Sequence, residues 1–165
     1  MIISFFLRNR GCRHRCIFCS ERVTGGEGAQ DLTEDFFRET VEKHLRTGGE
    51  GNDAEIAFYG GTFTLLSEAE RAACLELAAR WRQRGVVCRV RCSTRPDAVT
   101  EHGLTTLRAA GMDCVELGVQ SFDDAALAAA SRGYGGALAR AACAMVAGAG
   151  LELGVQLMPG MPGVT

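Results

Sequence analysis

The sequence lacks a long apolar segment, a secretion signal and a large net charge, and each absence narrows the possible functions. The apolar run at residues 2–7 is much shorter than the roughly 20 residues that a membrane-spanning helix needs, and no basic lead-in of a signal peptide precedes it. The formal net charge of −2 gives no overall attraction to nucleic acid. Eight cysteines without secretory features are typical of a reducing cytoplasm. We therefore expect a cytoplasmic protein with no membrane partner.

A phosphate-binding glycine fingerprint is also missing. The glycine-rich stretches at 23–30 and 48–53 do not have its spacing and are expected to be plain loops. The chain of 165 residues is long enough for one domain with a real core, and its apolar content of 47% is ordinary for a soluble protein. We therefore expect a single domain at residues 1–165.

Three cysteines lie within eight residues, directly after the first apolar run. Cys12, Cys16 and Cys19 have the spacing C-x3-C-x2-C, and a segment this short can fold into a loop that presents three thiolates to one compact metal centre. A structural zinc ion needs a fourth ligand, usually from a second Cys or His pair, and no such pair follows. Three thiolates fit an iron–sulfur cluster with one iron left open. Zinc remains the alternative.

The other five cysteines are scattered through apolar segments and are expected to be small buried hydrophobic residues. They are Cys74, Cys88, Cys92, Cys114 and Cys143.

The cysteine loop resembles the cluster motif of the radical S-adenosylmethionine (SAM) enzymes, including the aromatic Phe18 before the last cysteine. Four further blocks follow in the order of one branch: FYGGTFT at 58–64, STRPD at 93–97, GVQS at 118–121 and MPGMPG at 158–163. That branch includes the elongator-type tRNA uridine-modifying subunit and, more distantly, the oxygen-independent coproporphyrinogen oxidases. The blocks extend over nearly the whole chain, so the resemblance is to the superfamily core.

The resemblance implies the cofactors and the site residues. Cys12, Cys16 and Cys19 would each hold one iron of a [4Fe–4S] cluster, and SAM would chelate the fourth iron. An electron from a reductant protein would cleave SAM to a 5′-deoxyadenosyl radical, which abstracts hydrogen from the substrate. The implied SAM contacts are Phe18, Gly60, Gly61, Thr62, Ser93, Thr94, Gln120, Ser121 and Arg132. Arg132 would pair with the SAM carboxylate. Ser93 departs from the branch, which tends to have an acid there.

Strand and helix patterns alternate along the chain, which indicates βαβ units and a parallel sheet. The predicted strands are residues 2–7, 55–59, 86–92, 114–119 and 151–157. Thr33 is expected to cap a helix to about residue 46, and Ser67 with Glu70 forms a capping box for a helix to about residue 84. A shorter helix is expected at about 99–110. Ser121 and Asp124 are expected to cap Ala-rich helical sequence with a break near 133–136.

The strands have one apolar and one largely polar face. The expected apolar sets are Val86, Cys88, Val90 and Cys92; Val115, Leu117 and Val119; and Leu151, Leu153, Val155 and Leu157. Parallel strands that helices cover on both sides are apolar on both faces. The pattern therefore favours a curved sheet with a polar concave face. The resemblance implies an α/β partial (β/α)6 barrel, truncated here after the fifth strand, so that we expect an incomplete member.

The polar face is expected to carry an ionic network. Its residues are Glu55, Arg89, Arg91, Glu116, Glu152 and Gln156, with Val87 on the same face of the third strand. Buried charges must be paired, so we expect arginine–glutamate contacts between neighbouring strands. Three acids against two arginines leave one carboxylate for a cationic or hydroxyl-bearing ligand such as SAM. Loss of one acid is expected to leave a buried arginine unpaired.

The sequence is compatible with more than one class of substrate. A tRNA substrate requires a basic RNA-reading surface, and the basic residues around the cysteines hint at one: Arg8, Arg10, Arg13, His14, Arg15 and Arg22. A tetrapyrrole oxidase is the alternative enzyme, although Glu21 stands where those oxidases commonly have a further cysteine. A non-catalytic iron–sulfur or zinc module is the alternative from another class.

Overall fold

The computed structural model describes residues 1–7, 10–19, 32–47 and 54–162. Its strands are β1 (Ile2–Phe6), β2 (Ala54–Tyr59), β3 (Val87–Thr94), β4 (Cys114–Gln120) and β5 (Glu152–Leu157). Its helices are α2 (Glu34–Thr47), α3 (Glu68–Gln83), α4 (Glu101–Ala109), α5 (Asp124–Ala129) and α6 (Gly136–Gly148), with short 3-10 turns η1 (Phe63–Leu65) and η2 (Pro96–Ala98). The loops expected at 23–30 and 48–53 lie outside the described residues, as do Arg8, Glu21 and Arg22.

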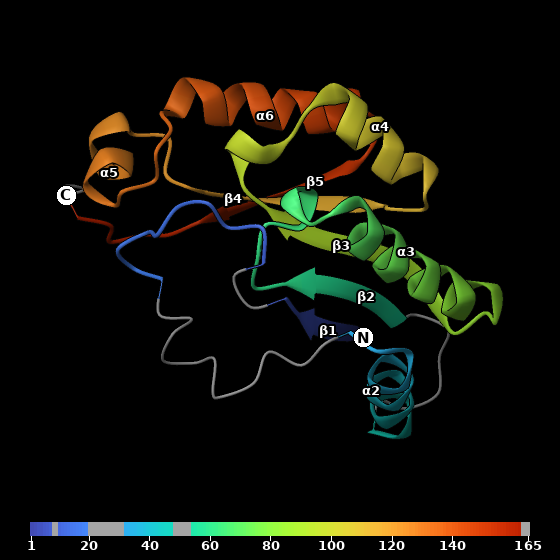
Figure 1. The fold of residues 1–165 in the computed structure, drawn as a ribbon. Coiled ribbons are helices and arrows are strands. Elements are labelled where there is room, and N and C mark those ends of the chain that lie inside the picture. The colour runs from blue at the N-terminus through green and yellow to red at the C-terminus, as the bar shows by residue number, and fades with distance from the viewer. Residues whose placement is uncertain (8–9, 20–31, 48–53, 163–165) are drawn as a thin grey trace.

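All five strands run parallel in one sheet, in the order β1-β2-β3-β4-β5. Figure 1 shows α2 beside β1, α3 beside β3, and α6 along β4 and β5, so that successive helices follow one side of the sheet. A doubly wound sheet reverses its strand order at a switch point, whereas this order progresses in one direction. The expected α/β partial barrel is confirmed. Among the described residues, no helix is long and apolar enough to cross a membrane.

The helix starts follow local capping signals. Ser67 and Glu70 form the expected capping box of α3. The expected cap of α5 is wrong by one residue: Asp123, not Asp124, accepts from the Ala126 backbone N–H at 2.8 Å. Asp124 instead accepts from the Gly136 backbone N–H at 2.6 Å, which joins α5 to the start of α6.

Aromatic rings fill the part of the core between β1, β2 and α2. Phe5 stacks on Phe37 with ring centroids 4.1 Å apart, and Phe58 stacks on Phe63 at 5.2 Å. All four side chains are almost completely buried. Burial of side chains of this size contributes the largest apolar areas in a core. These contacts therefore anchor β1, after which the cysteine loop begins.

The expected strand faces are confirmed in β4, where Val115, Leu117 and Val119 are buried. The assignment is wrong at the start of β3, where Val87 is buried and Cys88 is exposed. The reason is a register irregularity: Ala54 pairs with Val87, but its neighbour Glu55 pairs with Arg89. The extra residue reverses the alternation of side chains before it.

The expected apolar face of β5 is only partly covered. Leu151 is buried, but Val155 is 41% and Leu157 55% exposed. Within the described residues, β5 pairs with β4 alone. Packing from a single neighbour leaves these side chains in contact with solvent.

The scattered cysteines are buried in three of five cases. Cys74, Cys92 and Cys114 are buried and Cys143 is half-buried, but Cys88 is exposed because of the register irregularity. All eight cysteines lie in the described residues, and none forms a disulfide. Burial raises the pKa of Cys74 from 9.0 to about 11. The folded state therefore holds this proton at a pH where the unfolded chain releases it.

We predict that the Cys74 thiol makes the fold sensitive to alkali. The pKa of this thiol is higher in the folded than in the unfolded state. The stabilisation of the fold by the protonated thiol is therefore fully present below about pH 9 and is lost as the pH rises towards 11. Two pKa units correspond to roughly 2–3 kcal/mol. The free energy of unfolding of the wild type should therefore fall between pH 8 and pH 11 by roughly 2–3 kcal/mol more than that of Cys74→Ala. Urea unfolding across this range measures it, with Cys88→Ala as the exposed-thiol control. Equal losses in wild type and Cys74→Ala would contradict the prediction.

Candidate functional site

The cysteine loop lies at the carboxyl ends of the strands, the end toward which the arrows point in Figure 1. Its backbone is fastened to the turn after β2, where the Thr62 N–H donates to the Arg10 carbonyl at 2.9 Å. Gly11 has a φ of +76°, and a Cβ there would lie 2.4 Å from the Thr62 carbonyl oxygen. Only glycine permits this approach. The loop and the Gly-Gly-Thr segment therefore form one unit.

A second, small apolar cluster packs against the cysteine loop at Phe18. Phe18 and Met158 pack against buried Ala126, Ala130 and Met161. The Ile17 backbone N–H also donates to the Ala130 carbonyl at 3.3 Å. Residues from α5 and from the segment after β5 thus support the loop between its second and third cysteines.

A cavity of about 440 Å³ opens between the loop and the strand ends. Eleven of the twelve predicted site residues line it: Cys12, Cys16, Phe18, Cys19, Gly60, Gly61, Thr62, Ser93, Thr94, Gln120 and Arg132. Ser121 is not among the described residues that line it, and its hydroxyl accepts from the Asp123 backbone N–H at 3.1 Å. The tertiary structure therefore brings the cysteine loop, three of the four further blocks and Arg132 to one place.

Two arginines donate to the sulfur of Cys16. Arg132 Nη1 lies 2.9 Å and Arg95 Nη1 3.5 Å from Cys16 Sγ. The sulfur of Cys12 lies 3.1 Å from the Thr62 hydroxyl. Cationic and hydroxyl donors stabilise thiolates, which are the form that binds metal.

The three cysteines of the loop all line the cavity. Among the described residues, no three His, Cys, Asp or Glu side chains could hold one metal ion together. Ligands of one zinc ion must all lie close to it. A cluster separates its thiolates because each binds a different iron. Three thiols on one cavity wall could supply one ligand to each of three irons of such a cluster.

Arg132 is held by backbone carbonyl and phenol oxygens as well as by the sulfur. Its Nε lies 3.0 Å from the Tyr134 hydroxyl, its Nη2 donates to the Gly118 carbonyl, and its guanidinium faces the rings of Phe18 and Tyr134. The Tyr134 hydroxyl in turn donates to the Gly118 carbonyl at 2.9 Å. Burial raises the pKa of Tyr134, so this phenol stays neutral.

Gln120 has an unusual backbone and a buried acceptor. Its φ of +71° is rare for a residue with a side chain, and such strain concentrates at functional sites. Its Oε1 is buried and has no hydrogen-bond partner among the described residues. Nearby, Gly118 leaves room for the Gln120 amide, because a Cβ there would lie 3.1 Å from Gln120 Nε2. An unpaired acceptor on a cavity wall favours a ligand with an N–H or O–H donor.

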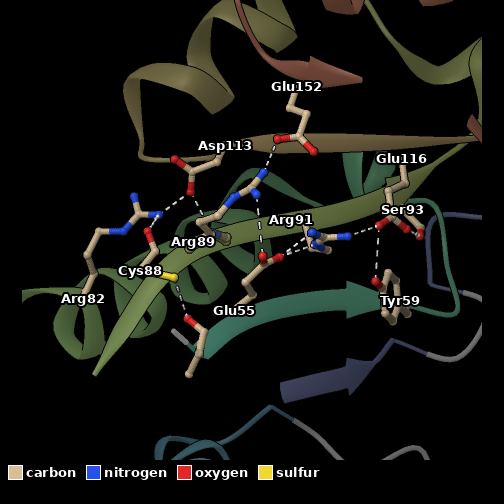
Figure 2. Close-up of polar contacts among 12 residues, drawn as sticks. Glu55, Tyr59, Arg82, Cys88, Arg89, Arg91, Ser93, Asp113, Glu116 and Glu152 are labelled. Carbon is tan, nitrogen blue, oxygen red and sulfur yellow. Dashed lines mark hydrogen bonds and ion pairs between the residues drawn. The ribbon is translucent and has the colours of Figure 1, made fainter. Parts of the chain in front are cut away.

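The polar face of the sheet forms a continuous ionic ladder, which Figure 2 shows across β2 to β5. Arg91 bonds to Glu55 and, at 2.8 Å, to Glu116. Arg89 bonds to Glu152 and lies 3.6 Å from Glu55. The expected arginine–glutamate contacts between neighbouring strands are confirmed.

The ladder ends at the cavity, where Glu116 accepts from the Tyr59 hydroxyl at 3.3 Å and from the Ser93 hydroxyl at 3.4 Å. Burial and the Glu116 charge raise the pKa of Tyr59. Glu116, Tyr59, Ser93 and Gln156 all line the cavity, so the floor carries a carboxylate, two hydroxyls and an amide.

The expectation of an unpaired arginine needs correction. Arg91 has two acidic partners, so the loss of Glu116 leaves Glu55 in place. Burial alone would lower the pKa of the Arg91 guanidinium, but its hydrogen bonds to Glu116 and Glu55 raise it overall.

Sequence reasoning missed several residues of the site. Arg95 and Asp97 form a bidentate pair at 2.8 and 2.9 Å, and His14 lies 3.9 Å from Asp97. Tyr134 was also missed and contributes by its contacts with Arg132, whereas Glu116 was expected on the polar face. Arg95 and Asp97 belong to the STRPD block, whose other members were predicted to line the site, so their place in that block was the available signal.

The comparisons with known proteins agree with this geometry. The family model of the radical SAM superfamily matches residues 7–165. The structure of Elp3 from the archaeon Methanocaldococcus infernus is similar with a TM-score of 0.73 and 21% identity, over 99% of this chain and 39% of that one. HydG, a maturase of the [FeFe]-hydrogenase, gives a TM-score of 0.72 and 15% identity, over 97% of this chain and 35% of that one.

A third structure carries a cofactor. The radical SAM methyltransferase TsrM from Kitasatospora setae, solved with cobalamin and a [4Fe–4S] cluster, has a TM-score of 0.64 and 21% identity, over 99% of this chain and 32% of that one. No curated protein sequence matches the chain. The chain thus spans about a third of the length of the solved relatives, whose low identity shows the fold alone.

We predict that Glu55 stabilises the ladder more than Glu116 does, because it faces both arginines. Glu55→Gln should lower the free energy of unfolding by about 2–3 kcal/mol and Glu116→Gln by about 1–2 kcal/mol, since bonds to charged groups are worth about 1.5–3 kcal/mol. Urea unfolding measures both. Glu76→Gln, which breaks an exposed pair with Arg80, is the control and should cost less than about 1 kcal/mol. A reversed order of Glu55 and Glu116 would count against the ladder.

Proposed function

The chain belongs to the radical SAM superfamily, and from this premise we propose that it holds a [4Fe–4S] cluster through Cys12, Cys16 and Cys19 and binds SAM beside it. The observation that carries the proposal is that all three cysteines line one cavity with eight further predicted residues, seven of which lie outside the cysteine loop in the sequence. Its volume of about 440 Å³ lies within the usual range of about 300–1,000 Å³ for small-molecule sites.

The residues present suit these two groups. The three thiols supply ligands for three irons and leave the fourth open. Arg95 and Arg132 place positive charge beside Cys16, which offsets the negative charge of a thiolate-bound cluster. The buried Gln120 Oε1 offers an acceptor to a ligand amine or hydroxyl. The chemistry that this pair supplies when bound is one-electron cleavage of SAM to a 5′-deoxyadenosyl radical, which abstracts hydrogen from a substrate.

The protein side chains would orient the ligand and neutralise its charge. Gly60 and Gly61 expose backbone groups to it, since they have no side chains. Arg132 is the proposed partner of the SAM carboxylate, to which Nη1 can donate its second N–H beside the bond to Cys16. Glu116 on the cavity floor can accept from ribose hydroxyls, next to Ser93. Thr62, Thr94 and Phe18 would complete the walls of the site, and a contact from Ser121 stays a prediction.

We further propose that residues 1–165 form a single radical SAM core domain. The enzyme is proposed to be cytoplasmic and to receive its electron from a reductant protein. The substrate class we propose is tRNA, on the resemblance to the elongator-type subunit and the structural similarity to Elp3. Arg13 and Arg15 are exposed on the loop beside the cavity, where they could meet phosphates. The chain spans about a third of the length of its solved relatives. Catalytic turnover is therefore best measured with a protein of full length.

We predict that the anaerobically reconstituted protein carries about four irons per chain, as a [4Fe–4S] cluster requires. Cys12→Ala, Cys16→Ala and Cys19→Ala should each abolish the cluster, whereas Cys74→Ala should retain it because its thiol lies in the core. Iron analysis and the visible absorption spectrum measure this outcome. Stoichiometric zinc without iron would instead favour a zinc module.

We also predict that Arg132→Gln weakens SAM binding to the cluster-loaded protein about tenfold or more, since bonds to charged groups are worth about 1.5–3 kcal/mol. Equilibrium dialysis with labelled SAM measures the affinity, and iron content verifies that the cluster is intact. The control is Arg108→Gln, whose guanidinium donates to the Ala149 carbonyl outside the cavity. Conversion of SAM to 5′-deoxyadenosine after reduction separates an enzyme from a cluster carrier.

A further inference from the structure

Arg95 is an almost completely buried arginine, only 6% exposed, whose guanidinium is held on several sides. Its Nε and Nη2 donate to the two carboxylate oxygens of Asp97 at 2.8 and 2.9 Å. Nη2 also donates to the Arg132 backbone carbonyl at 2.5 Å. A bidentate carboxylate pair orients the guanidinium plane as well as its position. The direction of the remaining amino group, Nη1, is therefore set by the protein.

That remaining group points at a sulfur atom. Arg95 Nη1 lies 3.5 Å from Cys16 Sγ, within the range of a hydrogen bond to sulfur. The Tyr134 ring supports the guanidinium from one face, with 5.3 Å between the Arg95 Cζ and the ring centroid. Arg95 follows β3 and Cys16 lies in the loop after β1, so the contact exists only in the folded protein.

Arg95 and Arg132 share this sulfur but differ in their surroundings. Arg132 bonds to neutral oxygens of Tyr134 and Gly118. Arg95 is paired with the Asp97 carboxylate, a partner that the protein itself supplies. The N–H donor of Arg95 beside Cys16 is therefore a fixed feature of the fold.

We propose that Arg95 is a positioning residue that orients the Cys16 sulfur and raises the reduction potential of the cluster bound there; this inference rests on the proposed function. Reduction adds one negative charge to a thiolate-bound cluster. A fixed N–H donor at one of its sulfurs stabilises the reduced state more than the oxidised state, because the acceptor sulfur is more negative after reduction. Asp97 acts one step further out by fixing the direction of this donor.

The test measures the midpoint potential of the cluster in the reconstituted protein. A redox titration without SAM, monitored by EPR, gives this potential. In Arg95→Gln the equilibrium constant for reduction should fall about tenfold, which is about 59 mV toward negative potential for a one-electron couple. Iron content should remain about four per chain. Arg95→Lys keeps the charge but loses the fork, so its potential should shift in the same direction by less. Arg108→Gln, outside the cavity, should match the wild type.

The outcomes separate this inference from the function on which it rests. A wild-type chain that takes up no iron overturns the proposed function and this inference with it. A wild-type cluster whose potential is unchanged in both Arg95 variants overturns the role of Arg95 alone. If Arg95→Gln does not assemble a cluster, Arg95→Lys decides: a negative shift supports the role, and a potential equal to that of the wild type overturns it. An equal shift in Arg108→Gln also overturns it.

Discussion

The site depends on one constraint, which is that five parallel strands in sequential order bring their carboxyl ends to the same edge of the sheet. Each strand is followed there by a segment that carries polar or small residues, and the order along the sheet matches the order along the chain. Cys12 and Thr62 follow β1 and β2, Thr94 and Gln120 end β3 and β4, and all four line one cavity. The same residues in a sheet with another strand order would lie apart from one another.

Charge compensation is the second organising feature. The concave face contains three glutamates and two arginines in a ladder, with one carboxylate, Glu116, reaching the cavity floor. Around the cysteine loop the balance is opposite, because two buried guanidinium groups face one sulfur. The cavity therefore has a cationic side at Cys16 and an anionic floor at Glu116. Such a division suits a ligand that carries both a negative and a positive group, since each charge can lie near its opposite.

The stability of the loop does not come from the main core. The main core anchors β1 before the loop through Phe5 and its aromatic neighbours, but the loop itself rests on the small cluster around Phe18. A cluster of this size buries little apolar area, and its contribution is correspondingly limited. Backbone hydrogen bonds to Arg10 and Ile17 supply further attachment. A loop held this way can keep its cysteines on one side of the cavity while its other side faces solvent.

The sequence by itself determined the features that depend on neighbouring residues: the cysteine spacing, the α3 capping box at Ser67, the five strands and the alternation of Val115, Leu117 and Val119. These signals lie within a few residues of one another, so no knowledge of the fold is needed to recognise them. Only the tertiary structure decided the surroundings of Cys16, whose partners Arg95 and Arg132 lie 79 and 116 residues away. It also decided the exposure of Cys88, because one extra residue in the β2–β3 register reverses which side chains face the core. Contacts between strands depend on register and curvature, and those arise only when the whole sheet has formed.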